Sequence, residues 1–243
     1  MSDFLAALQF LTICPWPRRA ERAPDEIGRG AVFFPLIGFI LGALLVLADW
    51  LVRPYLSPAL TAVTLATLLA VLSRGLHLDG LADTFDGLGA GGPRERMLAV
   101  MDDPRAGVFG VVAVVFVLLF KIHAIAALAS DRWRALLIAP TLARWAMALF
   151  GYRATAVKEG LGAHMIMHMT GARLFFGTAT TLILAIAVVG LRGLAAMALV
   201  ALLTLSSKLY FHRRLGGVTG DIFGAVAEVS ETLVLIAFAA GEQ

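Results

Sequence analysis

Long apolar runs constrain this chain more than any other feature. Of its 243 residues, 60% are hydrophobic and 15% carry a charge, and the apolar residues gather in runs of roughly 20, enough for a helix to cross the hydrocarbon core of a bilayer. The sequence therefore predicts an all-α, polytopic integral membrane protein whose single domain covers residues 1–243. We expect about seven transmembrane helices, at residues 32–52, 55–73, 107–129, 134–151, 174–191, 194–210 and 225–240.

A shorter amphipathic helix is expected at the N-terminus, over Met1–Ile13, closed by Pro15 and Pro17. The positive charges follow this apolar segment instead of preceding it, which argues against a cleavable signal peptide. The single cysteine, Cys14, excludes an internal disulfide framework, and we expect it to be an inert packing residue.

The distribution of Lys and Arg predicts the orientation in the membrane. The net charge of +3 does not lead us to expect nucleic-acid binding, because in a membrane protein basic residues report first on the cytoplasmic side. If the first span runs outward, thirteen basic residues fall on one side and four on the other. This count places the N-terminus and the loops 73–106, 152–173 and 211–224 in the cytoplasm, and the C-terminus outside.

Three aspartates lie at helical spacing in the first of these loops. Asp79, Asp83 and Asp86 are spaced i, i+4, i+7, so they share one face of a helix. Carboxylates so close repel one another unless a cation lies between them. A divalent metal ion is the simplest explanation, and an acidic, solvated helix end with ordinary surface ion pairs is the alternative.

Glycines and arginines follow the aspartates. Four glycines between residues 87 and 92 would let the backbone approach a ligand closely, and Arg94, Arg96 and Arg105 offer guanidinium groups suited to phosphate. Acidic groups for a metal and basic groups for phosphate thus lie side by side. The combination predicts phosphoryl transfer from a nucleotide or a diphosphate, with Mg²⁺ held by carboxylates and substrate oxygens.

A second acidic group lies at the start of the last predicted span. Asp221 and Glu228 are seven residues apart and share a helix face, with the small residues Gly224 and Ala225 between them. Glu228 and Glu231 would lie inside the span, where acidic side chains are costly and mark functional sites. Capping of the last helix could explain Asp221, but it leaves the two glutamates unexplained.

Other charged residues also fall within apolar segments. Lys121 and Arg144 could each neutralise a buried carboxylate or hold a substrate phosphate; for Lys121 a structural pair or snorkelling is an equal alternative, whereas we expect Arg144 to be functional. His77 could be a metal ligand, a base or a helix-end residue.

Histidine and methionine alternate further along the chain. His164 and His168 lie among Met165, Met167 and Met169. This resembles a soft-metal site, but in a glycine-containing loop the alternation is weak evidence for one.

Several segments resemble the cobalamin synthase family (adenosylcobinamide-GDP ribazoletransferase). They are the block from Gly75 to Gly87, Gln9–Thr12 with Pro15 and Pro17, Phe34–Gly38, Met101–Gly110, Glu159–Gly162 and Gly217–Asp221. The similarity spans essentially the whole chain, and the part from His77 to Gly87 is specific to the family. Ser73-Arg74, Cys14 and Pro104 depart from the family's usual residues, but none of them removes a presumed ligand.

The resemblance implies a Mg²⁺-dependent enzyme of the bacterial inner membrane that completes the nucleotide loop of cobalamin. Adenosylcobinamide-GDP would react with α-ribazole, or its 5′-phosphate, to give adenosylcobalamin, or its 5′-phosphate, and GMP. For such a reaction we expect the metal ligands among Asp79, Asp83, Asp86, Asp221 and Glu228, and the catalytic base among Asp79, Asp83 and His77. Which acid is base and which is ligand stays open, because neither the spacing nor the resemblance assigns these roles. The residues expected to bind substrate are Asp103, Arg105, Arg144, Gly217, Thr219 and Gly220. Whether the protein forms a homo-oligomer is an open question at this point.

Three rival functions are less consistent with the sequence. A CDP-alcohol phosphotransferase motif requires an arginine that is missing after Gly80, and a prenyltransferase requires a second aspartate-rich motif, which Asp221 with Glu228 imitates only loosely. A cation transporter could use the intramembrane charges, but the acids cluster in cytoplasmic loops and the two halves show no matching pair of broken helices.

Overall fold

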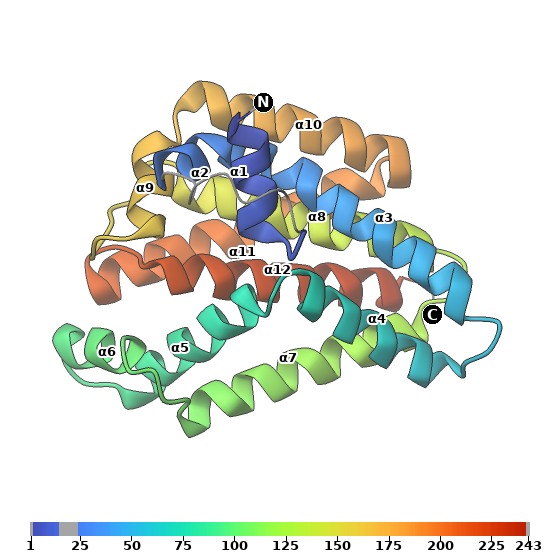
Figure 1. Ribbon diagram of the computed structural model, residues 1–243, viewed down its shortest axis with the longest axis horizontal. Coiled ribbons are helices and arrows are strands. Elements are labelled where there is room, and N and C mark those ends of the chain that lie inside the picture. The colour runs from blue at the N-terminus through green and yellow to red at the C-terminus, as the bar shows by residue number, and fades with distance from the viewer. Residues whose placement is uncertain (1, 15–23, 242–243) are drawn as a thin grey trace.

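The computed structural model describes residues 2–14 and 24–241, and every element in this part of the chain is a helix (Figure 1). The order is α1 (Ser2–Leu11), α2 (Pro24–Gly30), the short 3₁₀ helix η1 (Ala31–Phe33), α3 (Phe34–Val52), α4 (Pro58–Leu72), α5 (Leu76–Ala90), α6 (Arg94–Met101), α7 (Val108–Ala127), α8 (Arg132–Gly151), α9 (Leu161–His168), α10 (Gly171–Val189), α11 (Arg192–Leu215) and α12 (Gly220–Ala240). Pro15, Pro17 and the basic residues Arg18, Arg19 and Arg22 lie outside the described residues.

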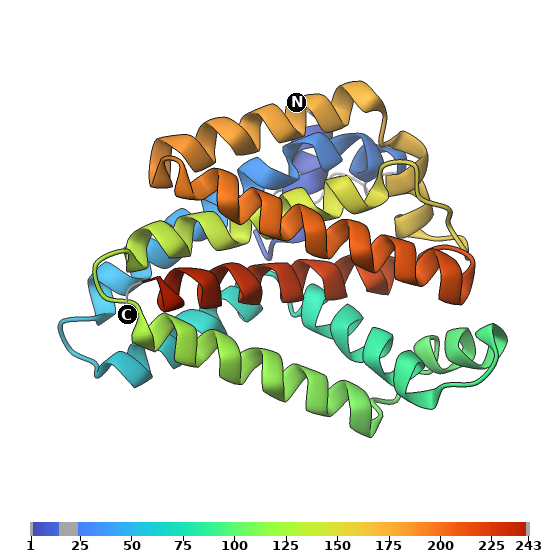
Figure 2. The same ribbon diagram turned by 180° about the vertical axis from the view of Figure 1, so that it is seen from behind.

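Helices α8 and α12 pack against each other in the centre of the molecule. In Figures 1 and 2, α3, α10 and α11 lie on the α8 side of this pair, and α4, α5 and α7 lie on the other side. Residues 135–148 of α8 are buried without a break. The core therefore runs along α8 and α12, while α7, α10 and α11 expose many apolar side chains on their outer faces, as expected for helices that face lipid.

A sharp break separates α4 from α5. The two helices meet at an angle of 89°, and the turn between them includes Arg74 and Gly75 with φ of 54° and 66°. Glycine adopts this left-handed conformation at little cost, whereas Arg74 is an uncommon non-glycine case. Nη2 of Arg74 donates a hydrogen bond to the carbonyl oxygen of Gln9, 3.1 Å away, so the N-terminal segment braces the turn. The break directs the first turn of α5 against α12.

The prediction of a polytopic, all-α membrane protein is confirmed, with a difference in the number of spans. Five segments, residues 24–52 and helices α7, α10, α11 and α12, are long and apolar enough to cross a membrane. The predicted span 55–73 corresponds to α4, which has 15 residues and qualifies only together with α5, as a sixth, broken span. The predicted span 134–151 lies in α8, which is less apolar because of its three arginines and is enclosed by other helices. Among the described helices, α4 with α5 is the one broken pair of this kind.

The N-terminal helix is confirmed as α1, whose Ala6, Ala7 and Leu11 are fully buried. Cys14, in contrast, is exposed, so our interpretation of it as a packing residue was wrong. It follows the end of α1, where the chain leaves the core.

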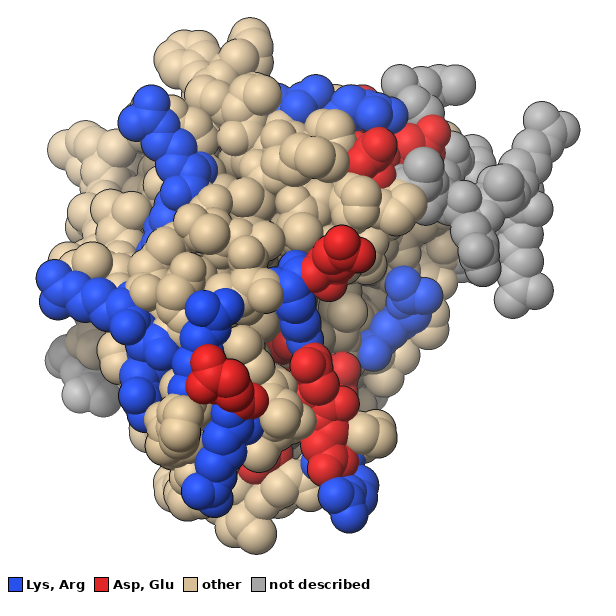
Figure 3. All heavy atoms as spheres, turned by 90° about the vertical axis from the view of Figure 1, so that its left-hand side faces the viewer, with Lys and Arg blue, Asp and Glu red and all other residues tan. Residues whose placement is uncertain are grey.

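Basic side chains gather at the end of the molecule that carries α6 and α9, whereas the last turn of α12 lies towards the opposite end (Figure 1). Figure 3 looks onto this end and shows Lys and Arg spread over it, with acidic side chains among them. The connections of residues 91–93, 102–107 and 216–219 run here. The loops that the sequence predicts to be functional are therefore collected at one end of the helical bundle.

Candidate functional site

A pocket of about 250 Å³ lies where α5, α9 and α12 meet. Three segments that are distant in the sequence supply most of its wall: residues 76–80, 158–163 and 218–224. Phe10 of α1 and the buried methionines Met147 and Met165 complete it. Each of the three segments contains one of the sequence motifs described above, so the fold brings these motifs to one place.

Very close backbone contact between α5 and α12 forms one side of the pocket. A Cβ atom at Gly80 would lie 2.5 Å from the carbonyl oxygen of Asp221, and one at Gly224 would lie 3.1 Å from the Cα atom of His77. Only glycine tolerates the first of these distances. As a result the first turn of α5, with His77 and Asp79, lies beside the first turn of α12, with Asp221.

A short backbone bridge positions a lysine in the same pocket. The N–H of Val157 donates to the carbonyl of Val218 over 3.1 Å, and the N–H of Val218 donates to the carbonyl of Thr155 over 2.8 Å. This bridge holds Lys158 beside α12, with its Nζ 3.3 Å from Oδ2 of Asp221 and in an ion pair with Asp102.

Neighbouring carboxylates keep the side chain of Lys158 protonated. Burial lowers the pKa of its ammonium group, but the hydrogen bond to Asp102 and the charges of Asp221 and Asp102 outweigh this effect, so the pKa is raised above its usual value. Lys158 is therefore a cation at neutral pH. Thr219 adds a hydroxyl group that donates to Oδ2 of Asp221 over 3.1 Å.

The aspartates of α5 differ in environment. Asp79 is exposed and lines the pocket, Asp83 is half-buried, and Asp86 is 7% exposed. The negative charges of Asp79, Asp221 and Asp86 all act on Asp83, so the four carboxylates share one electrostatic neighbourhood. The carboxylate of Asp86 accepts hydrogen bonds from the N–H groups of Gly107 and Gly110, at 2.7 and 2.8 Å, and so caps the start of α7.

The predicted metal ligands on α5 and α12 do not form a group of three whose ligand atoms lie close enough together to hold an ion on their own. Within the described ranges, the one group of three acidic or histidine side chains whose ligand atoms lie within 4.8 Å of one another is Asp25, His164 and His168. A Mg²⁺ ion needs only one or two protein carboxylates, because substrate oxygens and water complete its shell. The magnesium site at the aspartates stays a prediction.

Two predicted site residues take part in a buried ion cluster. Glu228 is ion-paired with Lys121, whose Nζ also lies 2.6 Å from Oε1 of Glu231, and the second oxygen of Glu231 is paired with Arg144. All four side chains are almost fully buried. For Lys121 and Arg144, the alternative of neutralising a buried carboxylate is therefore the one seen, and Arg144 is not among the residues that line the pocket.

His77 is the least satisfied side chain at the pocket wall. It is 1% exposed, and neither ring nitrogen has a hydrogen-bond partner within the described residues. A neutral imidazole in this state can accept a hydrogen bond at one ring nitrogen and donate one from the other when a substrate group enters the pocket.

Asp103 and Arg105 lie outside the pocket and bind each other. Nε and Nη2 of Arg105 donate to the two oxygens of Asp103 over 3.0 and 2.7 Å. Hydrogen bonds from the side chain and backbone of Arg105 lower the pKa of Asp103 to about 2, so the pair stays charged at neutral pH. Of the remaining predicted binding residues, Thr219 and Gly220 line the pocket, while Gly217 packs against the backbone of Thr155.

Comparison with known proteins agrees with this distribution of motifs. A sequence model of the family described as Cobalamin-5-phosphate synthase matches residues 3–239. The chain belongs to the cobalamin synthase family.

Curated relatives support membership of the cobalamin synthase family over the full length. Proteins named adenosylcobinamide-GDP ribazoletransferase are 39% identical in Geotalea daltonii, 41% in Pseudomonas paraeruginosa and 32% in Acetivibrio thermocellus. Each alignment covers 98% of this chain and at least 96% of the relative. No solved structure matches the chain. The chain is thus a transferase of the cobalamin synthase family.

Sequence reasoning missed one charged residue of the pocket in this cobalamin synthase family member. Lys158 entered only the count of basic residues, yet it contacts Asp221. Its position directly before the segment Glu159–Gly162, which resembles the family, was the available signal.

Proposed function

We propose that this chain transfers the adenosylcobinamide phosphate group from adenosylcobinamide-GDP to α-ribazole, or its 5′-phosphate, and releases GMP. The names of the curated relatives support this choice of donor and acceptor. The observation that carries the proposal is the meeting of Asp79, Asp221 and Lys158 in one pocket, because a diphosphate donor needs carboxylates for a metal ion and a cation for its own oxygens.

The diphosphate of the donor would bind at the start of α12. Lys158 supplies a positive charge there, and the N-terminus of a 21-residue helix favours anions through its unpaired N–H groups and its dipole. The hydroxyl group of Thr219 can donate a hydrogen bond to a phosphate oxygen. With a volume of about 250 Å³, the pocket takes the nucleotide or diphosphate part of the donor, and the much larger corrinoid would lie outside it.

The ligands of Mg²⁺ would be drawn from Asp79, Asp83 and Asp221. Carboxylate oxygens are the hard ligands that this ion prefers, and these three acids share one neighbourhood. Once bound, Mg²⁺ would neutralise negative charge on the diphosphate. We leave Asp86 and Glu228 out of the ligand set, because the first caps α7 and the second is paired with Lys121.

The transfer itself exchanges one P–O bond for another. The ribazole hydroxyl oxygen forms a bond to the phosphorus that carries cobinamide, and the bond from this phosphorus to the bridging oxygen breaks, so that the oxygen leaves with GMP. The hydroxyl proton passes to His77, or to whichever of Asp79 and Asp83 does not bind the metal ion. His77 is a candidate because it lines the pocket and its buried ring nitrogens have no other partner among the described residues.

We further propose that the protein lies in the bacterial inner membrane with the pocket open to the cytoplasm. The gathering of Lys and Arg at the end that carries α6 and α9 supports this orientation (Figure 3). The donor carries a charged diphosphate and both substrates are water-soluble, so they would arrive from that side.

The test is GMP release by the purified protein in detergent or liposomes. With both substrates and Mg²⁺ we expect release, and we expect a loss of about 100-fold in Asp79→Asn and in Asp83→Asn. Glu95→Gln, an exposed acid on α6, is the matched control and should keep full activity. Retained activity in both aspartate variants would refute the aspartate site, and no release from folded protein would refute the transfer reaction. In the second case, cation flux into liposomes that is lost in Glu228→Gln would favour the transporter.

A further inference from the structure

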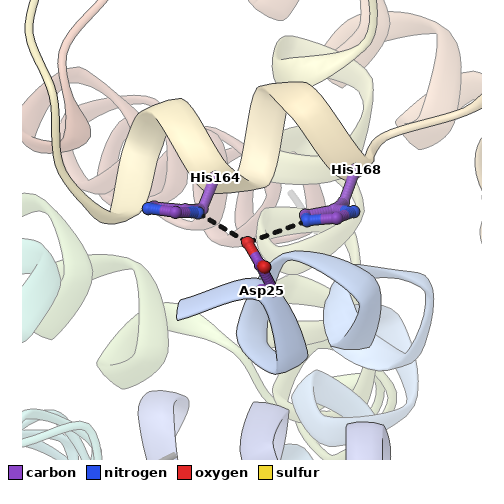
Figure 4. A group of neighbouring side chains, drawn as sticks. All are labelled: Asp25, His164 and His168. Atoms are coloured by element: carbon purple, nitrogen blue, oxygen red, sulfur yellow. Dashed lines mark hydrogen bonds and ion pairs between the residues drawn. The ribbon is translucent and has the colours of Figure 1, made fainter. Parts of the chain in front are cut away.

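A second cluster of metal-binding side chains lies between α2 and α9 (Figure 4). His164 and His168 are four residues apart on α9 and therefore lie on the same helix face, and Asp25 of α2 reaches between them. Nδ1 of His164 is 2.8 Å, and Nε2 of His168 is 3.0 Å, from Oδ1 of Asp25. The three ligand atoms all lie within 4.8 Å of one another.

The two helices come together at this cluster through a glycine. A Cβ atom at Gly28 would lie 2.5 Å from the carbonyl oxygen of His164 and 2.9 Å from Cδ2 of His168. Any larger residue would therefore push α2 away from α9. The close approach brings Asp25 to the two histidines although it is 139 residues distant from His164 in the sequence.

We propose that Asp25, His164 and His168 bind a divalent transition-metal ion such as Zn²⁺, separately from Mg²⁺ at the aspartates. Two imidazole nitrogens and one carboxylate oxygen are a ligand set typical of such ions, and two histidines at i and i+4 are a common way to present it. At metal–ligand distances of about 2.1 Å, neighbouring ligand atoms are about 3.0 Å apart in octahedral and about 3.4 Å apart in tetrahedral sites. The observed 2.8 and 3.0 Å are close to the octahedral value, and the two histidine nitrogens, which lie within 4.8 Å of each other, would move together when the ion binds.

The cluster also has room for further ligands. The side chains of Asp25, His164 and His168 are 49%, 35% and 22% exposed, so water can reach the ion and complete its coordination. Nitrogen ligands distinguish this cluster from the all-oxygen aspartates of α5 and α12, because Mg²⁺ prefers oxygen and is bound weakly by imidazole.

The metal ion would stabilise a wall of the main pocket. The same helix α9 that carries the histidines contributes Leu161, Gly162 and Met165 to the pocket. An ion that ties α9 to α2 would hold this wall against the α1–α2 layer. This effect on the pocket rests on the proposed function, whereas metal binding itself does not.

Metal binding can be measured directly, without substrates. The purified, chelator-treated protein would be titrated with Zn²⁺ by calorimetry in an excess of Mg²⁺, which occupies the oxygen sites, and with Co²⁺ by its visible absorption. We expect one Zn²⁺ ion per chain, and a loss of affinity of about 10-fold or more in His164→Gln and in His168→Gln. His123→Gln, an exposed histidine of α7, is the matched control and should bind as the wild type does, as should Asp79→Asn.

A variant that keeps all three ligands tests the geometry. Gly28→Ala should weaken Zn²⁺ binding because its Cβ atom separates α2 from α9. The proposal is overturned if the folded wild type does not bind Zn²⁺ in excess Mg²⁺, which would mean that the cluster is only a hydrogen-bonded link between helices. It is also overturned if His168→Gln and His123→Gln bind equally well. Because no substrate is used, a failure of ribazole transfer would leave this result unaffected.

Discussion

Gly80 of α5 lies against the backbone of Asp221 at the start of α12, so closely that a Cβ atom at residue 80 would be 2.5 Å from the Asp221 carbonyl oxygen and 3.0 Å from its Cα atom. This contact brings Asp79, the neighbour of Gly80, to the same pocket as Asp221. The close approach of α5 and α12 thus depends on the absence of a Cβ atom at Gly80.

Replacing Gly80 by alanine should separate the two acids. We expect GMP release to fall by about 10-fold or more, since small displacements of reacting groups cost this much, and the unfolding free energy to fall by about 1–3 kcal/mol from overpacking. Gly177→Ala in α10 is the control, because its Cβ atom would meet only an ordinary contact at 3.5 Å. Equal activity of the two variants would contradict the role of the close contact.

Removing Lys121 should destabilise the protein. In Lys121→Met, Glu228 loses its ion-pair partner and Glu231 keeps only Arg144, which should cost about 3–5 kcal/mol. Thermal unfolding in detergent measures the effect, with Arg213→Gln, an exposed residue of α11, as the control. Adding Glu228→Gln should recover part of the lost stability. No difference in unfolding between Lys121→Met and the control would show that the buried cluster is not structural.

Asp86→Asn should separate the capping role from metal binding. The variant loses part of the cap on α7, so we expect a loss of about 1 kcal/mol of stability and an unchanged Mg²⁺ concentration for half-maximal GMP release. Asp83→Asn is the matched comparison on the same helix, and it should raise the Mg²⁺ requirement. If Asp86→Asn raises it as much, Asp86 belongs to the metal site, as the spacing alone predicts.

Features that depend on residues close together in the chain could be predicted from the sequence. The apolar runs predicted five of the spanning segments, because length and composition decide whether a helix suits a bilayer. The spacing of Asp79, Asp83 and Asp86 predicted a helix, and α5 contains all three. The order of the family segments predicted a family that the comparisons show.

The long apolar helices, the membrane setting and the family could be predicted from the chain alone, because each follows from composition, periodicity or motif order. Which charged groups meet could be seen only once the helices were packed together. Lys158 reaches Asp221 through the bridge at Val218, Arg144 is taken by Glu231, and Asp25 reaches two histidines far along the chain. Such pairings depend on how helices and loops that are distant in the sequence pack together. Helix periodicity tells which face a residue shares, but it does not tell which other helix that face will contact.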